Sequence, residues 1–213
     1  MTNPIADPFV EVPDTNALSD LVRMEATPEG VVTVTLNRPE KKNAFDSELI
    51  SAMHEVFTTL GDQEAVRVVF LRGAGGMFCA GADLDWMRAA ADRTEADNRD
   101  DAYEMAKMLK SLWDIPALTV ALVEGGAFGG GAGVAAACDM AISTADAKFS
   151  FSEVRLGLVA ATISPYVIAA VGPRTARGLF ATGEPIAIRP LVERIGREVG
   201  KLGYSVTVVG AEA

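Results

Sequence analysis

The stretch Glu124–Asp139, EGGAFGGGAGVAAACD, is the most informative part of this sequence. An apolar run over 117–123 precedes its glycine cluster and predicts a strand, and the small-residue run Ala132–Cys138 predicts a helix. Such a junction presents backbone N–H groups at a helix N-terminus, where they can bind an anion or a developing oxyanion. We therefore expect the function to rest mainly on backbone donors.

Phosphate-binding patterns do not explain this glycine cluster. The sequence contains no GxxxxGK[ST], and its glycines do not give a clean GxGxxG with a ribose-binding acid downstream. Taken alone, the stretch would be interpreted by default as a turn that lets a helix pack closely on a sheet.

A second junction of the same kind lies earlier in the chain, at Arg72–Met87, RGAGGMFCAGADLDWM. It follows the apolar run 66–71, which predicts another buried strand. Two such junctions can place two N–H donors around one carbonyl oxygen.

Several motifs together resemble the enoyl-CoA hydratase/isomerase (crotonase) superfamily, over roughly residues 20–184. They are LNRPEKKNAF at 36–45, FCAGADL at 78–84, FGGG at 128–131, ACD at 137–139 and KFSFSEVRLGL at 148–158. The resemblance implies an α/β fold, a crotonase-like spiral of repeated β-β-α units. It also implies a thioester carbonyl held between the backbone N–H groups of Ala80 and Gly130.

The resemblance assigns the proton-transfer role to Glu153, in SFSEVRLGL; outside that motif, a surface carboxylate would be the ordinary interpretation. We expect Glu124 to have a turn role, Asp139 to be a positioning residue and His54 to lie on a helix face. Asp83 is expected to cap a helix and fix its loop. The predicted substrate-binding residues flank the two junctions: Lys42, Ala44, Ala80, Gly81, Ala82, Asp83, Leu84, Gly129, Gly130 and Gly133.

One position departs from the family pattern. Gly133 stands where the best-known hydratases carry a second catalytic glutamate. A subgroup resembling bacterial methylglutaconyl-CoA hydratases shares this small residue together with VRLGLVAATISPYV at 154–167. We favour a hydratase acting on methylglutaconyl-CoA or a similar branched or carboxylated enoyl-CoA, in amino-acid or isoprenoid breakdown. The alternatives are a Δ3,Δ2-enoyl-CoA isomerase with a single glutamate, and a non-catalytic acyl-CoA-binding paralogue.

Composition limits the other possibilities. The 213 residues are 49% hydrophobic and carry a net charge of −10, which argues against a nucleic-acid partner. Arg38, Lys41 and Lys42 form a candidate patch for the CoA phosphates, or equally a solvated turn. No metal-ligand cluster, membrane span or separate cofactor is expected, since CoA arrives with the substrate. We expect Cys79 and Cys138 to be buried free thiols, as in a cytoplasmic protein.

Three segments are expected along the chain. Residues 1–18 are predicted to be a loose arm, 19–184 the core domain, and 185–213 an atypical or truncated ending. The resemblance fades after Glu184, where 191–199 predicts a short helix and 204–209 a strand. A homotrimer or a dimer of trimers is expected if this ending permits it.

The periodicity also predicts the remaining elements. Strands are expected at 20–26, 31–37, 140–143 and 148–151, and helices at 46–60, 94–113, 165–171 and 173–182.

Overall fold

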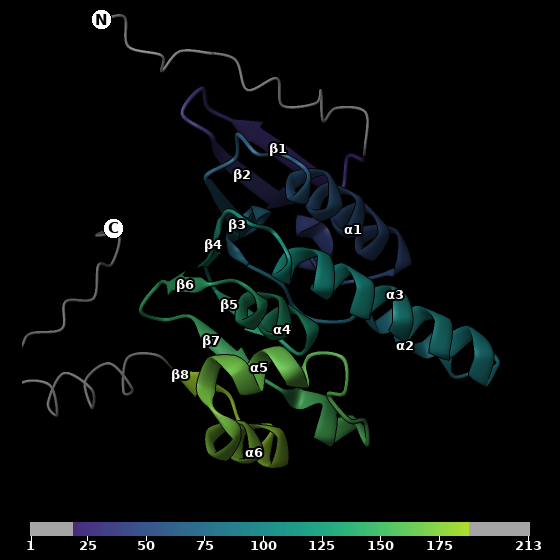
Figure 1. Ribbon diagram of the computed structural model, residues 1–213. Coiled ribbons are helices and arrows are strands. Elements are labelled where there is room, and N and C mark those ends of the chain that lie inside the picture. Colours follow the sequence, from purple (N-terminus) through teal and green to yellow (C-terminus); the bar gives the residue numbers. More distant parts are fainter. Residues whose placement is uncertain (1–18, 188–213) are drawn as a thin grey trace, which may run out of the picture.

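The computed structural model describes residues 19–187, which form two β-sheets with helices packed along one side (Figure 1). The larger sheet has five strands in the order β1-β2-β3-β4-β6. The smaller has three strands in the order β5-β7-β8. The predicted mixed α/β architecture is therefore confirmed.

The larger sheet begins with the predicted hairpin. β1 (Val22–Ala26) pairs antiparallel with β2 (Val31–Leu36), and Gly30 supplies the positive φ of the turn. β3 (Val68–Gly73), β4 (Leu118–Val123) and β6 (Met140–Ser143) then add in parallel. Along β2, half-buried and fully buried residues alternate, as expected for a strand with a single face in the core. The carboxyl ends of β3 and β4 therefore lie side by side at one edge.

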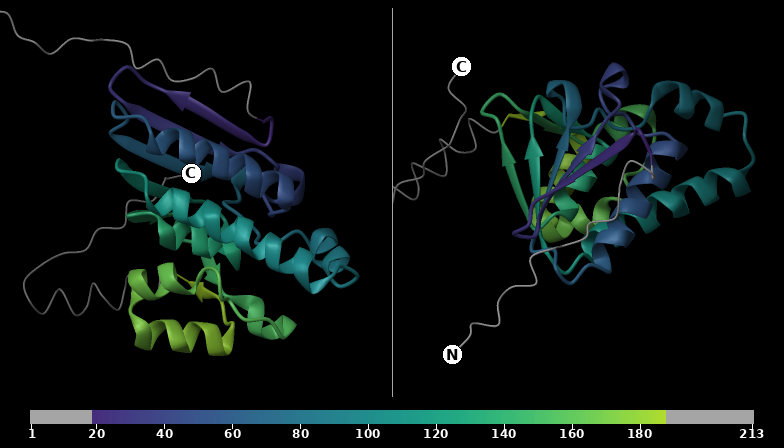
Figure 2. Two further views of the ribbon diagram at one scale, coloured as in Figure 1. Left: turned by 45° about the vertical axis from the view of Figure 1, so that its right-hand side comes forward. Right: turned by 90° about the horizontal axis from the view of Figure 1, so that it is seen from above.

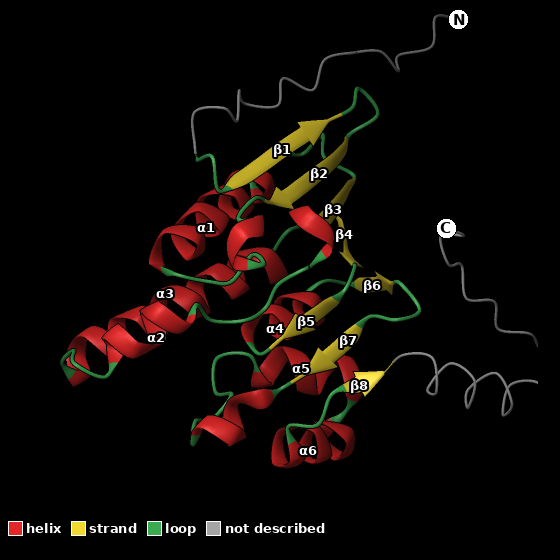
Figure 3. Ribbon diagram, turned by 180° about the vertical axis from the view of Figure 1, so that it is seen from behind, coloured by secondary structure: helices red, strands yellow, loops and turns green. Residues whose placement is uncertain are grey.

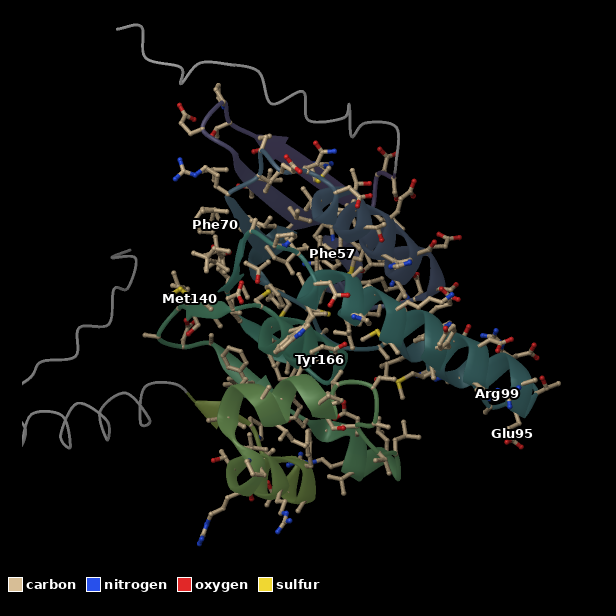
Figure 4. All side chains as sticks on the ribbon, viewed as in Figure 1. Phe57, Phe70, Glu95, Arg99, Met140 and Tyr166 are labelled. Carbon is tan, nitrogen blue, oxygen red and sulfur yellow. The ribbon has the colours of Figure 1, made fainter. Side chains whose placement is uncertain are left out.

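Two long helices cover the buried face of this sheet. α1 (Ser47–Gly61) is capped by Asp46, whose side chain accepts a bond from Leu49 N at 2.9 Å. α3 (Glu95–Trp113) begins with a capping box between Thr94 and Asp97. Figure 4 shows Phe57 of α1 on the inner side of the helix, where it is fully buried, whereas Glu95 and Arg99 project at the free end of α3.

The second half of the chain repeats a strand–strand–helix unit. β4 is followed by β5 (Gly126–Phe128) and α4 (Gly130–Ala137), and β6 by β7 (Lys148–Ser150), a 3₁₀ turn and α5 (Ser164–Val171). In each unit the first strand joins the larger sheet and the second joins the smaller one, so the chain advances as a spiral (Figure 2). Seen from behind, the strands form one wall and the helices the other (Figure 3).

Short elements complete the structure. α2 (Leu84–Ala90) follows the first glycine junction, and α6 (Pro173–Thr182) and β8 (Ile186–Ala187) close the described chain. The sequence patterns missed β5 and β8, because β5 lies within the glycine cluster and β8 has only two residues. The helix and strand predicted at 191–199 and 204–209 lie outside the described residues.

Candidate active site

The two glycine junctions meet at the carboxyl edge of β3 and β4. The N–H of Phe78 donates to the carbonyl of Glu124 at 2.9 Å. Cys79 then pairs with β5 in both directions, donating to Gly126 O at 3.2 Å and accepting from Phe128 N at 3.0 Å. These bonds fix one loop against the other, as the paired motifs predicted.

The segment 42–45 forms the outer side of the first loop. Phe45 N donates to Gly81 O at 2.7 Å, and Asp83 N donates to Phe45 O at 2.8 Å. Ala80 N donates to Lys42 O at 3.0 Å. This last bond contradicts the prediction that the Ala80 N–H faces a thioester, because that donor already has a backbone acceptor.

Two other amides at the junction are open. Within residues 19–187, neither Ala82 N nor Gly130 N has a hydrogen-bond partner. The two loops touch here, because a Cβ placed on Gly81 would lie 2.9 Å from the carbonyl oxygen of Phe128 and 3.9 Å from Gly129 Cα. Gly130 is the first residue of α4, so the helix dipole favours negative charge at its N–H. The pair of open donors is therefore Ala82 and Gly130.

The Glu153 carboxyl group lies against the same turn. It belongs to a 3₁₀ turn, Ser152–Leu156, and its Oε1 is 3.2 Å from the position that a Cβ on Gly129 would take. Its Oε2 is buried and has no hydrogen-bond partner among the described residues. Burial raises the pKa of Glu153, and a backbone hydrogen bond offsets this only in part. Glu153 is thus a partly buried carboxyl group with a raised pKa beside the glycine turn.

This raised pKa gives a stability prediction. A carboxyl group whose pKa is higher in the folded state stabilises the fold below its unfolded pKa, and that contribution is lost as pH rises above about 4.3. Glu153→Gln removes the titration. We expect the free energy of unfolding of wild type, relative to the glutamine variant, to fall between pH 4 and pH 7 in urea titrations. A constant difference across this range would contradict the burial of an unpaired carboxylate.

The side chain of Asp83 joins the first glycine loop to the start of α2 and to Arg38. Its side chain is 5% exposed, accepts bonds from Asp85 N and Trp86 N at the start of α2, and pairs with Arg38 at 2.9 Å. Burial alone would raise the pKa of Asp83, but these donors and Lys41 outweigh it and hold the pKa below its usual value. The predicted capping role of Asp83 is confirmed.

Only one cation of the predicted phosphate patch is unpaired within the described chain. Arg38 bonds Asp46, Asp83 and the carbonyl of Ala44, and Lys41 pairs with Asp85 at 2.8 Å. Lys42 is exposed and forms no ion pair with any residue between 19 and 187. Arg38 and Lys41 therefore hold the loop together, and Lys42 is the one residue of the patch that is not used in an ion pair within the described chain.

The other predicted binding residues are spread around this centre. Ala44 is buried, and its backbone N–H and carbonyl are both bonded within the loop, whereas Leu84 is 63% exposed at the start of α2. Gly133 lies one turn into α4 and is packed against Ile163: a Cβ there would be 2.2 Å from Ile163 Cγ2. The space above Gly133 is therefore already filled.

The supporting roles expected elsewhere are observed. The Asp139 side chain accepts bonds from the N–H and hydroxyl of Thr119, tying the end of α4 to β4. Glu124 is exposed and lies 3.9 Å from Arg72, and its carbonyl anchors Phe78. His54 contacts Ser111 across α1 and α3 at 3.1 Å. Cys79 and Cys138 are buried and free, and burial raises the pKa of each thiol to about 12.

Sequence reasoning overlooked Asn43. It is fully buried and has a left-handed φ of 55°, and its side-chain amide bonds the carbonyls of Ala74 and Met77. It thereby fixes the glycine loop that leads to Phe78. An asparagine before a capping aspartate is a turn signal, because asparagine tolerates this backbone region better than most residues.

Comparison with known proteins identifies the fold. Residues 26–193 match the family model described as enoyl-CoA hydratase/isomerase. The chain belongs to the enoyl-CoA hydratase/isomerase family. The crystal structure of an enoyl-CoA hydratase from Shewanella pealeana superposes with a TM-score of 0.79 and 38% identity, covering 84% of this chain and 67% of that one. The predicted crotonase-like fold is confirmed.

Two curated members of the family carry different reaction names. Enoyl-CoA hydratase AKT6-1 of Alternaria alternata is 34% identical over 168 residues, covering 77% of this chain and 53% of that protein. Ethylmalonyl-CoA decarboxylase of Danio rerio is 33% identical over 144 residues, covering 66% of this chain and 45% of that protein. The chain spans 53–63% of the length of the first curated relatives that it matches.

Two further observations concern residues 19–187 alone. They contain no group of three or more His, Cys, Asp or Glu side chains placed to hold a metal ion. None of their helices has the length and apolar character needed to cross a membrane.

Proposed function

We propose that this protein is a crotonase-type enoyl-CoA hydratase, a lyase that adds water to an α,β-unsaturated acyl-CoA thioester. The observation that carries the proposal is the convergence of Ala82 N–H, Gly130 N–H and Glu153 at one turn. Two open backbone donors beside an unpaired carboxyl group suit a reaction in which charge grows on a carbonyl oxygen while a proton moves nearby.

The chemistry follows from these three groups. As a water oxygen forms a bond to the β-carbon, the Glu153 carboxylate takes the water proton, and the C=C electrons move onto the thioester oxygen. Ala82 N–H and Gly130 N–H stabilise this enolate more than the ground-state carbonyl. Glu153 then returns the proton to the α-carbon, which restores the thioester and leaves Glu153 ionised for the next turnover.

The cavity beside Glu153 favours an uncharged hydrocarbon acyl group. It has a volume of about 210 Å³, and among residues 19–187 Glu153 is the only charged one that lines it. The other lining residues are mainly apolar: Phe151, Val154, Leu158, Val159, Ala160, Ser164 and Phe180. A carboxylated acyl group such as methylglutaconyl would meet Glu153 without a compensating cation. We therefore place it second to an uncharged branched enoyl-CoA.

A second candidate function is Δ3,Δ2-enoyl-CoA isomerisation. Gly133 supplies no second carboxylate, and one base suffices to move one proton along an acyl chain. A binding-only paralogue is the third candidate, since Gly133 stands where the best-known hydratases carry a second catalytic glutamate.

One ultraviolet assay separates these candidates. A conjugated 2-enoyl thioester absorbs more strongly than its hydrated or 3-enoyl counterpart. We expect absorbance to fall when the purified protein meets 2-enoyl-CoA esters, fastest with 3-methylcrotonyl-CoA, then 3-methylglutaconyl-CoA. A rise with a 3-enoyl-CoA instead would favour the isomerase. Calorimetric binding of both esters without any absorbance change would favour the paralogue.

Lys42 is expected to bind a CoA phosphate. Lys42→Ala should raise KM about 2–10-fold and leave kcat unchanged, because the cation acts far from the reacting carbons. Raising the salt concentration should shrink this difference by screening. Lys107→Ala, which removes an exposed lysine paired with Glu104, is the control. An equal rise in KM for both variants would mean a general charge effect.

We further propose a cytoplasmic location and assembly as a homotrimer or a dimer of trimers. Gel filtration with light scattering tests the assembly.

A further inference from the structure

Gly129 is the N-cap of α4 and Gly133 lies inside the helix, and the N–H of Gly133 donates to the carbonyl of Gly129 at 3.1 Å. Each glycine is covered by a side chain from the following part of the chain. The Glu153 carboxyl group covers Gly129, and Ile163, which directly precedes α5, covers Gly133. An acid and a hydrocarbon therefore cover two glycines that one hydrogen bond of the first helical turn joins.

The contact at Gly133 is tight and cannot relax easily. A Cβ added there would lie 2.2 Å from Ile163 Cγ2 and 2.6 Å from Ile163 Cβ. The Cβ of isoleucine is fixed to the backbone, so a rotamer change cannot clear it. Ile163 is 2% exposed, and its carbonyl accepts the N–H of Val167 at 3.1 Å. Its backbone is thus fixed at the start of α5.

The same segment also borders the Glu153 cavity. Ala160 and Ser164, on either side of Ile163 in the sequence, both line that cavity with Glu153. Ile163 itself points to α4 and fills the volume into which a side chain at 133 would extend.

We propose that Ile163 is the specificity-determining residue that makes this a one-carboxylate site. By filling the volume above Gly133, it excludes a second acid from the position next to Glu153 and leaves a hydrocarbon wall there. This inference rests on the proposed function of Glu153. It predicts that Gly133 and Ile163 can change only together.

The claim that Ile163 fills the volume above Gly133 can be tested by thermal unfolding, without any activity assay. In a helix interior, Gly→Ala normally stabilises. At Gly178 of α6, a Cβ would meet nothing within 4 Å, so Gly178→Ala should raise Tm by about 1–3 °C. Gly133→Ala should instead lower Tm by about 3–8 °C, because it overpacks Ile163. In an Ile163→Ala background, this penalty should largely disappear.

Two outcomes of this measurement would overturn the proposal. One is that Gly133→Ala is tolerated as well as Gly178→Ala. The other is that its cost is unchanged by Ile163→Ala. If Ile163→Ala does not fold, the comparison of Gly133→Ala with Gly178→Ala still decides.

The pH profile tests the functional part. Two double variants are compared, and each carries Ile163→Ala. The glutamate pair adds Gly133→Glu and the glutamine pair adds Gly133→Gln, so the two proteins differ only in an ionisable group at position 133. We expect the glutamate pair to show one additional ionisation in kcat/KM that the glutamine pair and wild type lack. Identical profiles for both pairs would overturn the proposal. Absence of any turnover in wild type would instead reject the proposed function, while the stability comparison would still report on Ile163.

Discussion

Glu153→Gln is expected to lower the hydration rate by about 10²–10⁴-fold, with little change in the affinity for CoA esters. Glutamine keeps the shape of the side chain against Gly129 but cannot take a proton from water. The loss should appear in kcat, because the thioester would still bind to Ala82 N–H and Gly130 N–H. Stopped-flow absorbance for turnover and calorimetry for binding measure the two effects separately.

Glu124→Gln is the matched control for this experiment. Glu124 also lies in the glycine-rich region, but its side chain is exposed and 3.9 Å from Arg72. We expect its replacement to leave turnover nearly unchanged. If Glu153→Gln kept most of the activity, Glu153 would not be the acid/base, and a loss with Glu124→Gln would transfer that role to Glu124.

Gly130→Pro is expected to lower turnover by about 10²–10³-fold, the scale on which removal of one oxyanion donor acts. Gly130 is the first residue of α4, where proline is well tolerated because that N–H has no intrahelical acceptor. The substitution therefore removes the open donor itself and leaves the helical hydrogen bonds in place.

Gly130→Ala separates this effect from crowding. Any Cβ at this position would lie 2.9 Å from Met105 Cε and 3.1 Å from the Phe45 ring, so both variants share this crowding, to which proline adds its Cγ and Cδ atoms. Only proline also lacks the N–H. Circular dichroism and Tm first establish that both variants fold. Equal turnover of the alanine and proline variants would show that the glycine turn serves packing alone.

Much of the architecture was predictable because its signals are local. Periodicity predicted a strand at 31–37 and helices at 46–60 and 94–113, close to the observed bounds of β2, α1 and α3. The two glycine junctions indicated backbone donors before any spatial information. The motif around Glu153 singled out that carboxylate, whose cavity is lined mainly by residues between 151 and 164, together with Phe180 of α6.

Which two N–H groups are free to act as donors depends on tertiary contacts, and the position of a residue in a motif does not predict those contacts. Ala80 and Ala82 are the same residue type, two positions apart, in one loop. Their roles differ because the segment 42–45 lies alongside that loop and uses Ala80 N–H, while Ala82 N–H is left open. In the same way, Arg38 and Lys41 appeared free to bind phosphate until Asp83 and Asp85 were brought beside them.

The sequence by itself determined the order of strands and helices, the glycine turns and the family, since these depend on periodicity, capping and residues close together in the chain. The tertiary structure decided which N–H groups remain without a hydrogen-bond acceptor and which cations form ion pairs within the protein. It also decided what fills the space above Gly133. That space appeared vacant in the sequence because glycine has no side chain. In the fold Ile163 occupies it, 30 positions later in the chain. The free donors, the ion pairs and the filled space all depend on contacts between segments that are far apart in the sequence. Only folding brings those segments together.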